Sequence, residues 1–150
     1  MRLATANLLL LLAPALAAPA WAEPPARCRV RSIHALDADG GVDKKIAKLR
    51  PLLGKPPFDR FKSFKLIKED AVDAEIGRES AVEVPSGKKL VVTFLERVKG
   101  DKKPLLRVKL DYGGVATTYR VGEGDPIPLV VGAHAGGTLV LAVDCASKKK

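Results

Sequence analysis

The sequence predicts a mainly β fold, a small antiparallel β-sandwich or barrel-like domain with one short N-terminal helix. Two observations predict it. Beyond residue 58, the apolar side chains follow the period of strands in several short segments. Turns that contain Gly or Pro separate these segments, and apolar residues at helical spacing are confined to residues 43–53. About eight short strands and one helix suit a single β-rich domain.

Residues 1–22 are predicted to be a cleaved signal peptide. Arg2 gives a positive start, residues 8–12 are leucines, and Ala20 and Ala22 flank Trp21 in an A-x-A cleavage site. The mature chain is then residues 23–150, a length that suits one domain with a short basic C-terminal tail. We expect an exported protein, periplasmic or extracellular, with no transmembrane span in the mature chain.

Two other interpretations of this leader are weaker. A membrane anchor needs about 20 apolar residues, whereas Pro14 and Pro19 interrupt a shorter run. A lipoprotein would carry its lipid on Cys28, but Arg27 stands directly before that cysteine, where a small residue is required. A cleaved signal peptide is therefore the favoured interpretation.

The two cysteines stand near opposite ends of the mature chain, at Cys28 and Cys145. In an oxidising compartment such a pair is expected to form a disulfide. A zinc site is disfavoured because the histidines, His34 and His134, are not at metal-ligand spacing. Because the closed loop is long, the chain-entropy model gives the disulfide about 4–5 kcal/mol as an upper figure.

The first predicted strand is residues 28–36, in which Cys28 and Val30 share one face and Arg29 and Arg31 the other. Residues 37–43 contain the Asp and Gly residues of a turn. The strand should therefore be half-buried and should lead through this turn into the helix.

The predicted helix begins at Asp43, whose carboxylate is a suitable N-cap, and extends to about residue 53. Ile46 and Leu49 fall at helical spacing, on the face expected to be buried. Pro51 should shorten or kink the helix, and Gly54 should end it.

The remaining predicted strands are residues 61–67, 81–84, 90–98, 105–112, 115–121, 129–132 and 138–145. Residues 90–98 are apolar on both faces, which predicts a central strand. Gly113 and Gly114 predict a tight hairpin between residues 105–112 and 115–121. In the last strand, Cys145 shares a face with alternating apolar residues, so the disulfide should join neighbouring first and last strands.

The acidic cluster Asp37, Asp39 and Asp43 has some likeness to a metal site. Counted from Asp37, however, the sixth position of an EF-hand loop is Val42 and the twelfth is Lys48, where Gly and Glu are required. A turn followed by a helix cap is the favoured interpretation, and weak calcium binding is left open. No cofactor is expected.

Ser32 and His34 are the residues nearest to a catalytic arrangement. Nucleophilic catalysis needs a base within hydrogen-bond reach and an oxyanion hole, and the sequence has no G-x-S-x-G or comparable motif. The protein is therefore expected not to be an enzyme. His134 stands between glycines and alanines and is predicted to lie in a loop.

Phe58, Phe61 and Phe64 recur every third residue. This spacing suits either a stacking platform for bases or sugar rings, or core packing under the helix. Aromatic residues make up only 5% of the chain, which favours the core.

Basic residues give the best indication of a partner, since the net charge is +9. Those predicted to form a surface for an anionic partner are Lys62, Lys65, Lys68, Lys88, Lys89, Lys102, Lys103, Arg107 and Lys109. An anionic envelope polymer or an acidic protein would suit them. Nucleic acid is not expected, because no binding motif for it is present. The alternative role of these residues is solubility, because acidic residues are interspersed among them.

The segments IHAL, LRPLLGKPPF, SFKLI and GTLVLAVDC resemble those of a family of small, uncharacterised exported bacterial proteins of myxobacterial type. The resemblance covers most of the mature domain. It implies a secreted or periplasmic domain and assigns no catalytic or binding residues.

Two functions follow from these observations. The first is a noncatalytic binding module of the envelope that contacts an anionic component through its basic surface. The second is a structural subunit of a cell-envelope assembly, recognised through an exposed strand edge. An enzyme ranks third, and the sequence gives no oligomeric state.

Overall fold

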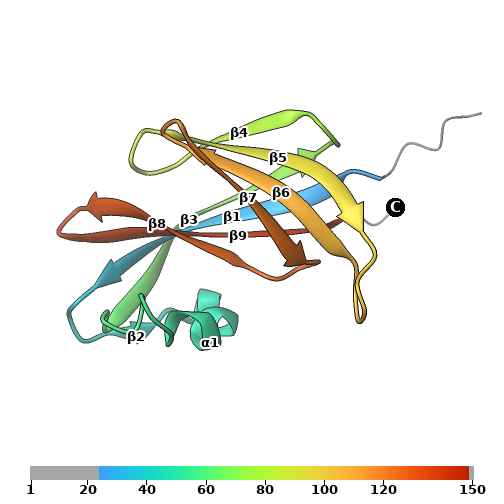
Figure 1. Cartoon of the computed structure of the whole chain (residues 1–150). Helices are drawn as coiled ribbons and strands as arrows, with labels where there is room; N and C mark the ends of the chain where they lie inside the picture. The colour runs from blue at the N-terminus through green and yellow to red at the C-terminus, as the bar shows by residue number, and fades with distance from the viewer. Residues whose placement is uncertain (1–23, 149–150) are drawn as a thin grey trace, which may run out of the picture.

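The computed structural model describes residues 24–148, so the predicted signal peptide lies outside the described residues (Figure 1). The protein is mainly β, as predicted, with one short helical segment. Its strands are β1 (Ala26–Leu36), β2 (Gly41–Val42), β3 (Ser63–Ala74), β4 (Glu79–Glu83), β5 (Lys89–Val98), β6 (Leu105–Tyr112), β7 (Val115–Gly122), β8 (Ile127–His134) and β9 (Gly137–Ser147). Among the described residues, no helix is long and apolar enough to cross a membrane.

The strands form two sheets. Sheet A has the order β2-β3-β1-β9-β8, and sheet B has the order β4-β5-β6-β7. Apart from the short parallel pair of β2 and β3, neighbouring strands within each sheet are antiparallel. Both sheets have free edges, so the described strands form no closed barrel.

β1 contributes to the core from both faces, because its first half places apolar residues on one face and its second half places them on the other. Cys28 and Val30 belong to a cluster of buried side chains drawn from both sheets. Ile33 and Ala35 point to the opposite face, into a second cluster with the helical segment. Sheet B and the helical segment accordingly lie on opposite sides of sheet A (Figure 1).

The predicted disulfide is confirmed. Cys28 of β1 lies directly opposite Cys145 of β9, and the two are bonded. Both residues are buried, and the bond joins the first and last strands across 117 positions of sequence. It therefore ties together the two ends of the domain.

The helical segment differs from the single predicted helix. It begins with the 3-10 helix η1 (Lys44–Leu49) and continues as α1 (Arg50–Leu53). The backbone of Ile46 leaves the helical region at φ −121°, and Pro51 stands in the first turn of α1. Asp43 caps the segment as predicted, because its carboxylate accepts the N–H of Lys45 at 3.0 Å.

The phenylalanines serve core packing, the favoured of the two interpretations. Phe58 and Phe64 are buried in the cluster beneath the helical segment, and Phe61 is partly buried against it. These three rings therefore do not form an exposed surface on which bases or sugar rings could stack.

Two other expectations need correction. β3 extends to Ala74, seven residues beyond its predicted end, because it pairs with β1 along its whole length and absorbs an extra residue at a bulge near Ile67. His134 is not a loop residue, since it ends β8 and pairs with Gly137. The turn between His134 and Gly137 is tight, so β8 extends as far as His134.

Candidate functional site

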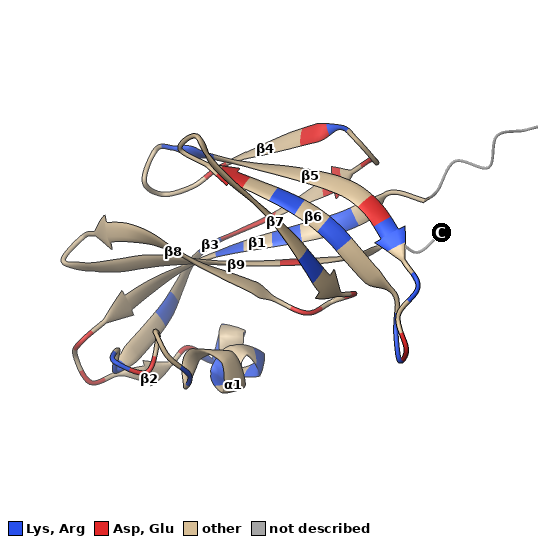
Figure 2. Cartoon of the chain, in the orientation of Figure 1, with Lys and Arg blue, Asp and Glu red and all other residues tan. Residues whose placement is uncertain are grey.

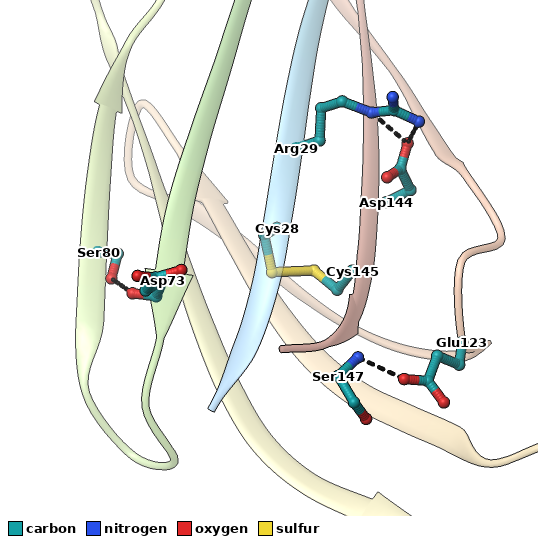
Figure 3. The surroundings of a disulfide bond; sticks show 8 residues. All are labelled: Cys28, Arg29, Asp73, Ser80, Glu123, Asp144, Cys145 and Ser147. Carbon is teal, nitrogen blue, oxygen red and sulfur yellow. Dashed lines mark hydrogen bonds and ion pairs between the residues drawn. A yellow bond between two sulfur atoms is a disulfide. The ribbon is translucent and has the colours of Figure 1, made fainter. Parts of the chain in front are cut away.

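The first candidate site is a charged cluster on the outer face of sheet A, next to the disulfide (Figure 3). The Asp144 carboxylate accepts hydrogen bonds from Arg29 Nη2 at 3.1 Å and from Arg31 Nη2 at 2.8 Å. The side chain of Arg31 is only 7% exposed and that of Asp144 13%. Arg31 and Asp144 therefore form a largely buried ion pair, which the half-exposed Arg29 joins at the surface. The three residues are here called the Asp144 cluster.

An open hollow of about 570 Å³ lies over this face, between the side chains of β1, β3 and β9. Its charges are paired across strands. Asp73 accepts a hydrogen bond from Lys148 Nζ at 2.9 Å and lies 4.0 Å from Arg27. The Lys148 ammonium lowers the pKa of Asp73 below its ordinary value. Because the cations around it have carboxylate partners, the hollow offers a partner no group of unpaired cations.

A second polar contact holds the C-terminal strand against the β7–β8 turn (Figure 3). The backbone N–H of Ser147 donates to the Glu123 carboxylate, and Arg97 donates to Ser147 Oγ at 2.6 Å. Hydrogen bonds from the side chain and backbone of Ser147 lower the pKa of Glu123. The ionised carboxylate is therefore favoured in the folded state.

This contact predicts a pH dependence of stability. Because folding lowers the pKa of Glu123, its contribution is complete above about pH 4.5 and is lost as the pH falls through the lowered pKa. Glu123→Gln should therefore reduce the slope of unfolding free energy against pH in acid and leave the slope near neutrality unchanged. Urea titrations at a series of pH values would measure it. Asp101→Asn, in the exposed β5–β6 loop, is the matched control. Equal acid slopes for wild type and Glu123→Gln would contradict this account.

The third feature is a group of cations on the outer face of sheet B, which we call the basic face: Arg107, Lys109 and Arg120. Arg107 of β6 lies directly opposite Arg120 of β7, and Lys109 is two residues along on the same face of β6. Arg107 Nε lies 3.2 Å from Glu96 Oε1. Within residues 24–148, Lys109 and Arg120 have no carboxylate within ion-pair distance. Figure 2 shows blue Lys and Arg bands on β6 and β7.

The structure brings together only two of the nine cations singled out in the sequence, Arg107 and Lys109. The others fall into three separate groups. Lys88 and Lys89 are at the start of β5, and Lys102 and Lys103 are in the loop beyond its other end. Lys62, Lys65 and Lys68 belong to β3 or precede it, in sheet A.

Several of these separate lysines have contacts of their own. Lys103 Nζ lies 2.5 Å from Asp125, and Lys68 Nζ lies 3.3 Å from Asp70. Lys88 lies over the ring of Tyr112, 5.8 Å from its centroid. Their roles are therefore local ones in the structure.

Arg120 joins the basic face although the sequence analysis did not single it out. A signal for it was present in the sequence. The two-residue turn at Gly113 and Gly114 fixes the hairpin register, and counting back from it places Arg120 opposite Arg107.

The fourth feature is an apolar groove of about 270 Å³ between β7 and β8, the edge strands of the two sheets. Its walls include Leu110 and Tyr119 from sheet B and Leu129 from sheet A. Val115, at the rim, is 73% exposed, the most exposed of the large apolar side chains described. The groove is therefore an opening between the sheets at their common edge.

Among the residues considered for catalysis or metal binding, His34 and Asp43 have structural contacts. His34 Nε2 lies 2.9 Å from the carbonyl oxygen of His134, and the buried Ser32 hydroxyl has no hydrogen-bond partner among the described residues. Asp43 accepts the N–H groups of Lys45 and Leu66, which lower its pKa. In residues 24–148, no three His, Cys, Asp or Glu side chains are placed to hold a metal ion.

Comparison of the chain with protein-family models, with curated proteins and with solved structures finds no match. The resemblance to small exported bacterial proteins stays a prediction. The interpretation of function therefore depends on the geometry of this chain alone.

Proposed function

We propose that the protein is an exported, noncatalytic binding module whose basic face contacts an anionic component of the cell envelope, either a polymer or an acidic protein. One observation carries the proposal. Arg107, Lys109 and Arg120 are neighbours on one sheet face, and the last two have no carboxylate partner in the described part of the chain. Such a group attracts phosphate or carboxylate groups.

The two outer faces of the molecule differ in a way that favours this choice. The outer face of sheet A is covered in part by the helical segment, and the rest bears the matched charges around Asp144. Neither hydrophobic cluster includes side chains from the outer face of sheet B. The basic face is thus free to meet a partner.

The spacing of the basic face suits a repeating anion. Residues opposite one another on adjacent strands are about 5 Å apart, and residues two apart on one strand are about 7 Å apart. Three cations at these distances can contact successive anionic groups of one polymer. Exposed attraction of this kind is screened within about 3 Å at 1 M salt, so binding should be strongly salt-dependent.

Architecture and location belong to the same proposal. We infer that the two sheets pack face to face as a β-sandwich, which the buried cluster shared by both sheets supports. Export to the periplasm or the medium is supported by the disulfide, since such bonds persist in oxidising compartments.

Reversing two charges of the basic face provides the test. Lys109→Glu combined with Arg120→Glu should weaken binding to polyphosphate or polyglutamate at low salt about tenfold or more, because two attractions become repulsions. Lys44→Glu with Lys48→Glu changes the net charge equally on the exposed side of the helical segment and should have a much smaller effect. Isothermal titration calorimetry with each polymer measures both and separates phosphate from carboxylate preference.

Three results would contradict the proposal. Equal losses in the two double variants would mean that only net charge matters. No binding of either polymer by the wild type at low salt would remove the anionic partner. Turnover of a substrate that is lost on His34→Ala would overturn the noncatalytic assignment.

The edge of sheet B favours a second candidate, a structural subunit that is joined to its neighbour by strand pairing. β7 ends this sheet and has no strand on its outer side among the described residues. In such an assembly, the free edge of β7 is where the strand of the neighbouring subunit would pair.

A further inference from the structure

The sheet edges of this protein are not equally protected. β3, which the two-residue β2 covers only at its start, carries charged residues along its length, including Lys65, Glu69 and Asp73, and has a bulge in its pairing with β1. β4 has five residues, two of them Glu, and β8 contains Pro128 and a register shift beside Gly132. Proteins use such devices to prevent edge pairing. They protect every edge except that formed by β7.

β7 lacks these devices. It has eight residues without Pro, its pairing with β6 shows no register shift, and its one charged residue is Arg120. Its first residue, Val115, is 73% exposed. An unguarded strand with an exposed apolar residue is suited to pair with another strand.

The hairpin geometry determines which backbone groups of β7 are free. Gly113 and Gly114, both at positive φ, form the two-residue turn, so the flanking pair Tyr112 and Val115 exchange both hydrogen bonds. The backbone N–H and C=O groups of Val115, and of every second residue after it, therefore point to β6. Those of Ala116, Thr118 and Arg120 point to the free edge.

We propose that β7 pairs antiparallel with β7 of a second copy of this chain, with the two-fold axis at Thr118. In this register Thr118 lies opposite its own copy, and Ala116 lies opposite Arg120 of the other copy. These are the residues whose N–H and C=O groups point outward, so both pairs exchange hydrogen bonds. Sheet B of one copy and sheet B of the other then form one continuous sheet.

Side chains on both faces of the strand are complementary in this register. On the inner face, the exposed Val115 meets Val121 of the other copy, and Thr117 meets Tyr119. On the outer face, Arg120 reaches over the small Ala116 of the other copy toward Asp111, which lies beside Ala116 on β6. Within one chain Arg120 has Arg107 as its neighbour, so the pairing gives this cation an acidic group.

The pairing also joins the two basic faces. The Lys109 residues of two copies would be separated by the paired β7 strands, a distance of about 14 Å at the usual strand spacing. The dimer does not depend on anion binding, and its test measures mass and register only.

Two cysteine variants test the register in the full chain. Thr118→Cys should give a disulfide-linked dimer on non-reducing gels, because Cα atoms of a hydrogen-bonded pair are about 5.5 Å apart. Ala116→Cys is the matched control, an equally exposed residue on the same face of β7. Its two copies would lie about 13 Å apart along the strands, so it should remain unlinked. Equal linkage of both variants, or of neither, overturns this register.

Sedimentation equilibrium tests the association itself. The wild type should have the mass of two chains, and Thr118→Pro that of one, because Pro removes an N–H that faces the free edge and leaves the bonds to β6 intact. Circular dichroism identifies a folded variant, and Thr118→Lys, which places two like charges opposite each other, serves if Thr118→Pro unfolds. A wild type that stays monomeric at its highest soluble concentration refutes the proposal. So does a dimer that persists in the folded variant.

Discussion

Replacing Asp144 with Ala is expected to lower the free energy of unfolding by about 3–5 kcal/mol, the usual cost of breaking a buried ion pair by removing one partner. The carboxylate serves both Arg29 and Arg31, and Arg31 is 7% exposed. Without Asp144 the buried guanidinium of Arg31 loses the carboxylate that pairs with it, and its Nε already has no hydrogen-bond partner among the described residues. Urea denaturation followed by circular dichroism measures the change.

Two control variants distinguish the cost of leaving a buried charge unpaired from the cost of losing one negative charge. Asp73→Ala removes a carboxylate from an exposed pair on the same sheet and should lower the free energy of unfolding much less. Arg31→Met combined with Asp144→Leu replaces both buried charges by apolar groups and should recover most of the stability lost in Asp144→Ala. A loss in Asp144→Ala no larger than in Asp73→Ala would show that the Asp144 cluster is solvated in solution.

Removing the disulfide with Cys28→Ala and Cys145→Ala should cost about 2–5 kcal/mol. The bond closes a loop across 117 positions, so it restricts the unfolded chain strongly. Both sulfurs are buried between the sheets, so reduction also removes a fixed contact from the core. Thermal and urea unfolding with and without a reductant measure the effect.

The double alanine variant is also the control for the reductant. Reductant should lower the unfolding midpoint of the wild type toward that of the variant and leave the variant unchanged. Wild-type protein in which both thiols are shown to be reduced, yet whose midpoint does not move, would contradict the assigned stabilisation.

The sequence was sufficient for those parts of the fold in which one face of a strand is buried. β6 shows this best, because Leu106, Val108 and Leu110 alternate with polar residues and are buried as predicted. β3 was predicted too short because residues 68–74 have charged side chains on both faces, and only the pairing with β1 shows that they form a strand. Local periodicity does not report such pairing.

The candidate site was predictable only in part, for a similar reason. Lysines close in sequence were grouped together, but the turns at the two ends of β5 separate Lys89 from Lys102 by the length of the strand. The contact between Arg31 and Asp144 spans 113 positions, so nothing in the local sequence indicates it. Register counting from a tight turn would have found Arg120, whereas no local rule would have found Asp144.

The position of β1 has a consequence for the order in which the chain becomes structured. β1 is the first strand to be synthesised, yet its neighbour β9 is the last. Sheet A can therefore not be completed until nearly the whole polypeptide has left the ribosome, and contacts of such long sequence separation form slowly. Sheet A of a nascent chain therefore stays incomplete until β9 is made, and the arrival of β9 is also what brings Cys145 to Cys28.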